Sequence, residues 1–134
     1  MKRIFIWSIV LLLAIGAWGL NEMAFGHASL VTADSNIQPG QVLSADQVPA
    51  VITLTFSEEL LPERSAIWVL NITDAEDFIV DTGKIGVDLD NADRNTLTAE
   101  LPETLEPGLY QVKWVAITPN DAGFREGELL FAVQ

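Results

Sequence analysis

Short runs in which every second residue is apolar recur along most of this 134-residue chain. In the clearest of them, Ile52, Leu54 and Phe56 alternate with two threonines. A period of two places alternate side chains on one face of a strand, whereas a helix needs apolar residues three and four positions apart. Turn residues separate seven such runs, at 28–33, 51–56, 66–72, 78–80, 97–101, 110–116 and 129–133. The spacing predicts an all-β fold, a seven-stranded Greek-key β-barrel or sandwich of the Ig-like kind.

Two tryptophans are the largest apolar residues within these runs. Trp114 alternates with Gln111 and Lys113 in the run 110–116, so it is expected to point inward. Trp68 lies in the run 66–72, where both faces are apolar. The pattern predicts that both indole rings are core anchors and do not form a ligand platform.

Two segments between the runs have less regular patterns. The segment 118–127 is expected to be a long polar loop, in which Phe124 is an exposed aromatic suited to a partner contact. A single helical turn is expected at 57–61, where Pro62 would end it.

The first 26 residues have the order of a secretory signal peptide. Lys2 and Arg3 precede seventeen uncharged residues from Ile4 to Leu20, and 24–26 (Ala-Phe-Gly) places small residues at the −3 and −1 positions of a cleavage site. Cleavage after Gly26 would leave a mature domain, 27–134, that begins with a histidine. Two alternatives remain, cleavage two residues later and retention of the segment as a membrane anchor, because seventeen residues is near the lower limit for spanning a bilayer. The expected location is periplasmic or extracellular, with membrane attachment only if the segment is retained.

The chain is strongly acidic, with 7 basic and 19 acidic residues and a net charge of −12. Loss of Lys2, Arg3 and Glu22 with the leader leaves 5 basic and 18 acidic residues, a net charge of −13. Such a surface repels phosphate backbones, which argues against nucleic acid as a partner.

The residue types needed for several kinds of site are missing. With no cysteine, the chain has no disulfides, no thiolate metal site and no thiol nucleophile. With one histidine, His27, a Ser-His-Asp triad is implausible, and no enzymatic activity is expected. The acidic pattern Asp88-x-Asp90-x-x-Asp93 lacks the glycine and the final glutamate of an EF-hand loop, so a solvated turn is expected there.

Four segments of the chain carry recognisable motifs: the mature start His27-Ala28-Ser29-Leu30-Val31, the strand 52–58 that ends Phe-Ser-Glu, the segment 105–114 with its Pro-Gly-x-Tyr-x-Val-x-Trp pattern, and the closing strand 127–133. In this order they resemble the CopC family of exported bacterial copper-resistance proteins. Each motif alone is weak, but the four follow one another behind a signal peptide.

The resemblance implies a seven-stranded Greek-key barrel and a Cu(II) site. In the family, the N-terminal histidine, a carboxylate and a second histidine from an Asp-x-His motif hold the copper, and the glutamate of Phe-Ser-Glu lies near them. The matching residues here are His27, Asp121 and Glu58. Counting forward from Trp114 instead places Asn120 at the position of the aspartate. The second histidine is absent in either register, because Gly123 or Ala122 stands in its place.

A processed N-terminal histidine suits Cu(II), because its α-amine and its imidazole Nδ1 close one chelate ring on the same ion. With one or two carboxylates, this gives the tetragonal N and O donor set that Cu(II) prefers. The expected function is therefore copper binding for resistance or homeostasis, with the copper ion and a copper-transport membrane protein as partners. A metal-free Ig-like interaction module that uses the 118–127 loop is the alternative.

Overall fold

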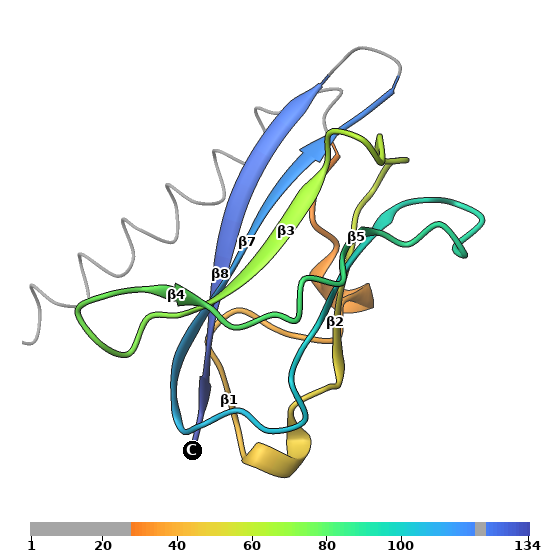
Figure 1. Ribbon diagram of the computed structural model, residues 1–134. Coiled ribbons are helices and arrows are strands. Elements are labelled where there is room, and N and C mark those ends of the chain that lie inside the picture. The colour runs from red at the N-terminus through yellow and green to blue at the C-terminus, as the bar shows by residue number, and fades with distance from the viewer. Residues whose placement is uncertain (1–27, 120–122) are drawn as a thin grey trace, which may run out of the picture.

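The computed structural model describes residues 28–119 and 123–134, which form two β-sheets packed face to face (Figure 1). The larger sheet has the strand order β1-β8-β7-β3-β4 and the smaller one β2-β6-β5. The described residues contain no α-helix, only the short 3-10 turns η1 (Thr32–Asp34) and η2 (Ala45–Gln47). The all-β sandwich predicted from the sequence is confirmed.

Eight strands build the sandwich in the described part of the chain. Neighbouring strands run antiparallel, except that β1 and β8 are parallel. The strands are β1 (Gln41–Leu43), β2 (Val51–Thr55), β3 (Ala66–Asn71), β4 (Phe78–Ile79), β5 (Ile85–Val87), β6 (Thr96–Glu100), β7 (Gly108–Ile117) and β8 (Phe124–Val133).

The predicted set of strands differs from the observed one at three places. Residues 28–33 form only a single bridge, Leu30 to Phe56, followed by η1. The short strands β1 and β5 were missed, because three residues are too few to establish a period of two. The turn expected at 57–61 is a bend without helical hydrogen bonding.

The long polar loop expected at 118–127 is also wrong. β8 begins at Phe124 and pairs with β7 without interruption, from Ile117 opposite Phe124 to Gly108 opposite Val133. Its first two inward positions hold Arg125 and Gly127, so the apolar alternation that marks the rest of the strand is missing there. The connection between the two strands is correspondingly shorter than predicted.

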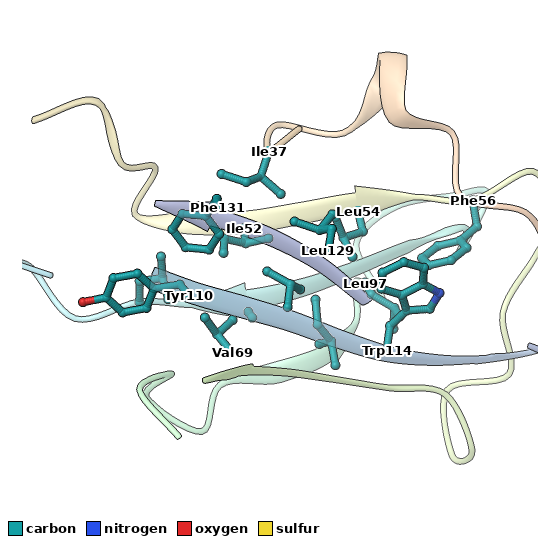
Figure 2. Packing of buried hydrophobic residues seen from close by; sticks show 14 of the residues in the cluster. Ile37, Ile52, Leu54, Phe56, Val69, Leu97, Tyr110, Trp114, Leu129 and Phe131 are labelled. Carbon is teal, nitrogen blue, oxygen red and sulfur yellow. The ribbon is translucent and has the colours of Figure 1, made fainter. Parts of the chain in front are cut away.

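The core lies between the two sheets and follows the predicted alternation. Ile52 and Leu54 of β2 face Val112 of β7, and each of these residues is fully buried. At one end of the core, Phe56 meets Trp114 edge to face with ring centroids 6.1 Å apart, and at the other Tyr110 stacks on Phe131 at 5.3 Å (Figure 2). Aromatic pairs thus close both ends of the core.

Trp68 is not the core anchor that the sequence predicted. It pairs with the exposed Lys113 across β3 and β7, so both side chains project from the outer face of the large sheet. The inward residues of β3 are instead Ile67, Val69 and Asn71. Since both faces of β3 are apolar, the sequence alone does not show which one is buried.

The free edge of β2 is covered by an irregular segment, not by another strand. Asn36 takes the place of a strand residue: its Nδ2 donates to the carbonyl of Val51 at 2.8 Å, and its Oδ1 accepts from the backbone N–H of Thr53 at 2.8 Å. Ser35 Oγ accepts from the N–H of Thr55 at 3.0 Å. These contacts satisfy backbone groups that an open edge would leave available for pairing with another chain.

Replacing Asn36 with alanine is expected to lower the free energy of unfolding by about 1–2 kcal/mol, because two hydrogen bonds are lost at a sheet edge. Asn36→Asp keeps the acceptor for Thr53 but sets a second oxygen against the carbonyl of Val51, so it should be at least as destabilising. Urea unfolding measures both. An equal loss for Asn91→Ala, in the loop before β6, would show that the effect is not specific to the edge.

Tyr110 fastens the start of β7 to the turn before it. Its hydroxyl donates a 2.6 Å hydrogen bond to the carbonyl of Glu106, four residues upstream, as in the tyrosine corner of immunoglobulin-like sandwiches. Burial raises the pKa of the Tyr110 hydroxyl above its ordinary value of 10.0, and the nearby charge of Glu106 adds a smaller effect in the same direction. The folded protein therefore retains this proton more strongly than the unfolded chain does.

The Tyr110 contribution to stability should be complete below pH 10 and should be lost as the pH rises through the raised pKa. Tyr110→Phe is expected to cost about 1–2 kcal/mol at pH 8, because the hydrogen bond to Glu106 is removed. The difference between wild type and variant should shrink above pH 10. Urea midpoints at pH 8 and pH 11 test this, and a constant difference would contradict the assignment.

Candidate functional site

The first described residues are bonded to the end of β2. Ser29 and Ser57 make two hydrogen bonds: the N–H of Ser29 donates to Ser57 Oγ, and the N–H of Ser57 donates to the carbonyl of Ser29, both at 2.8 Å. The N–H of Val31 donates to the carbonyl of Thr55 at 2.7 Å. Ala28 is fully buried beside them. The chain therefore enters the domain at a fixed point next to the end of β2.

The start of β8 reaches the same point. Arg125 Nη1 donates to Ser29 Oγ at 3.2 Å, which joins segments 96 residues apart in the sequence. Arg125 occupies an inward position of β8, opposite Ala116. One end of the sandwich thus brings together the N-terminal segment, the residue after β2 and the beginning of β8.

The connection from β7 to β8 is closed by a backbone bond. The N–H of Thr118 donates to the carbonyl of Gly123 at 3.1 Å, and both residues are buried. Phe124, which follows, is 54% exposed, as the sequence predicted. Gly123 occupies one of the two candidate positions for the missing histidine and carries no side chain with which to bind a metal.

The three predicted site residues differ in what the structure says of them. Glu58 follows Ser57 and is exposed at this end of the sandwich. His27, Asp121 and the alternative Asn120 lie outside the described residues. Their neighbours in the chain, however, converge: Ala28 next to His27 and Ser57 next to Glu58 belong to segments that are hydrogen bonded to each other.

Within residues 28–119 and 123–134, no three His, Cys, Asp or Glu side chains lie close enough to hold a metal ion. The acidic turn before β6 is consistent with the expected solvated loop, because Asp88 Oδ1 accepts from the backbone N–H of Asp90 at 3.0 Å. No helix of the described chain has the length and apolar character needed to cross a bilayer.

Sequence reasoning missed Arg125 as a residue of this end of the sandwich. The sequence placed it in a polar loop, where a basic side chain is common and indicates no particular role. The register of β8 shows that its side chain points inward, toward Ser29. No short-range pattern relates the two positions.

Comparisons with known proteins are consistent with this architecture. Residues 32–134 match the model of the CopC domain. No curated protein matches the chain.

Two solved structures share the fold and a quarter of the sequence. One is PcoC, a methionine-rich copper resistance protein from Escherichia coli, with 25% identity and a TM-score of 0.64 over 81% of this chain and 100% of that one. The other is CopC from Methylosinus trichosporium OB3b, with the same identity, TM-score and share of this chain, and 94% of its own.

Proposed function

Because this chain belongs to the CopC family, we propose that it is an exported, non-catalytic protein that binds Cu(II) through the N-terminal His27 of its processed form. Asp121 supplies a carboxylate, and Glu58 is a further ligand. The proposed role is copper resistance or homeostasis, in which the protein holds Cu(II) and passes it to a copper-transport protein of the membrane. The match to the CopC domain over residues 32–134 is the observation that carries this proposal.

The hydrogen bonds at the end of the sandwich support the proposed ligand set. Ser29 is anchored to Ser57 by two backbone-mediated bonds and to Arg125 by its hydroxyl. A histidine two residues before Ser29 and a glutamate one residue after Ser57 start from adjacent points of this framework. Because the chain is anchored at this point, less conformational entropy is lost when a metal ion brings the ligands together.

The donor set favours Cu(II) over the other divalent ions of the first transition row. The α-amine and imidazole of an N-terminal histidine supply two nitrogens, and the carboxylates supply oxygens, which together suit tetragonal geometry. The net charge of −13 in the processed chain raises the local concentration of cations without selecting among them. Loss of the second histidine removes a nitrogen donor, so binding is expected to be weaker than in a site with two histidines.

Titration of the exported, processed protein with Cu(II) tests the proposal, with the first residue established by mass spectrometry. A visible d–d band should saturate at one equivalent. His27→Ala should weaken binding at least about 100-fold, because it removes the imidazole and with it the chelate ring, and leaves the α-amine as the one nitrogen donor of this residue. Asp121→Ala should have a smaller effect. Glu59→Ala, which removes the carboxylate next to Glu58, is the matched control and should change nothing.

A metal-free interaction module is the second candidate, favoured by Gly123 at a candidate position of the histidine. In this alternative the exposed Phe124 contacts a protein partner. A mature chain that starts elsewhere than His27, or Cu(II) affinity unchanged by His27→Ala, would exclude the copper proposal and leave the module.

A further inference from the structure

The face of the large sheet that points away from the core is mostly apolar. The strand registers place Val42, Ile79, Leu109, Phe124 and Leu130 on this outer face, and each is between 39% and 58% exposed. Trp68 lies among them, half-buried. An antiparallel sheet with one face in water normally alternates apolar and polar residues, so a sheet that is apolar on both faces indicates that the second face is also covered.

Most charged residues of the protein lie away from the outer face of the large sheet. Along the strands of the large sheet, only Glu126, Glu128 and Lys113 put charged side chains on the outer face, a net charge of −1 in a chain of −12. A chain with this much negative charge repels copies of itself in most orientations. The outer face is the exception, because two copies meeting there bring little like charge together.

The three charged residues surround a hollow in this face. Trp68, Lys113, Val115, Glu126 and Glu128 line a depression of about 380 Å³ over the backbone of β7 and β8. Its walls offer an aromatic ring, a cation and two carboxylates. When two identical faces meet across a two-fold axis, Lys113 of one copy can lie against the carboxylates of the other, so the hollow is complementary to its own copy.

The size of the face fits a weak dimer. With strands about 4.8 Å apart and about 3.3 Å of rise per residue, the large sheet presents roughly 500 Å² of flat surface per copy. Two copies would bury roughly 1,000 Å², near the lower limit for a specific protein interface. The roughly 500 Å² of one copy is comparable to the largest apolar patch of a typical monomer, a size at which such patches are often functional.

We propose that the outer face of the large sheet is a homodimer interface, in which the large sheets of two copies pack back to back. The dimer is symmetric, and its dissociation constant lies in the micromolar range, as expected for an interface of this size. None of the residues named on this face is a proposed copper ligand, so dimerisation does not require copper.

Sedimentation velocity of the exported protein, from about 5 to 500 µM, tests the proposal, and a concentration-dependent shift from monomer to dimer is expected. Leu130→Glu should weaken the dimer at least about tenfold, because it adds a negative charge at the centre of the apolar face. Leu89→Glu is the matched control: Leu89 is 61% exposed in the loop after β5, and the variant should dimerise like the wild type. Circular dichroism shows that both variants fold.

Tryptophan emission gives an independent signal. The processed chain retains only Trp68 and Trp114 of the four tryptophans, and Trp114 is buried at 8% exposure. A blue shift with rising protein concentration must then come from Trp68, and Trp68→Phe should abolish it. A protein that stays monomeric at 500 µM overturns the proposal. Equal effects of Leu130→Glu and Leu89→Glu overturn it as well. So does a monomer in which another protein, or the retained segment 4–20, protects this face.

Discussion

Replacing Gly127 with alanine is expected to lower the free energy of unfolding by about 3 kcal/mol, at the upper end of what overpacking costs. A Cβ at this position would lie 2.3 Å from Trp114 Cζ2 and 2.8 Å from both Cε2 and Cη2. The indole ring lies opposite Gly127 and also contacts Phe56 edge to face. The overlap is with the rigid ring and not with the end of a flexible side chain, so the ring, the strand or the core has to shift.

The melting temperature measures this effect, and a decrease of roughly 10–20 °C is expected for a domain of this size. Trp114→Phe provides the control, because the smaller ring leaves room for a methyl group at Gly127. In the double variant, the second substitution should therefore cost less than it does alone. Full additivity would show that the contact between Gly127 and Trp114 does not explain the loss.

The pairing of Trp114 with Gly127 shows what the sequence could predict and what it could not. The alternation of 110–116 correctly placed Trp114 inward, because polar residues mark the other face of that strand. No such marker exists in β3, so Trp68 was assigned to the wrong face. A period of two identifies a strand, but only polar residues on one side identify which face is buried.

The beginning of β8 was missed because its first inward positions are not apolar. Arg125 and Gly127 occupy inward positions where an apolar residue would have continued the pattern, and each has a tertiary reason to be there. Gly127 makes room for an indole ring of the neighbouring strand, and Arg125 reaches Ser29. Contacts between residues distant in the sequence determine which residue type fits at such positions, and the local periodicity of the sequence does not reveal these contacts.

The assignment of the candidate site rests more on the sequence than on the described structure. The family resemblance named His27, Asp121 and Glu58, and the match to the CopC domain confirms the family. The structure adds the hydrogen bonds that bring the neighbours of His27 and Glu58 together. Copper binding by all three residues stays a prediction, and His27 and Asp121 lie outside the described residues.

Cu(II) binding by the processed chain is expected to weaken by on the order of 10²- to 10³-fold between pH 7.5 and pH 5.5. Both nitrogen donors must lose a proton to bind the metal, and a free α-amine and an imidazole have ordinary pKa values of about 7.7–8.0 and 6.5. Over this range the amine accounts for most of the loss. A site made only of carboxylates would lose almost nothing, since these groups remain ionised until about pH 4.

Acetylation of the α-amine separates the two donors. The acetylated protein should bind Cu(II) far more weakly at pH 7.5, and its affinity should then fall only about tenfold down to pH 5.5, because the imidazole alone still titrates. A competing chelator of known affinity, corrected for its own protonation, gives the constant at each pH. If free and acetylated chains showed the same pH dependence, the amine would not be a ligand, and the copper would be bound without the chelate ring that an N-terminal His27 provides.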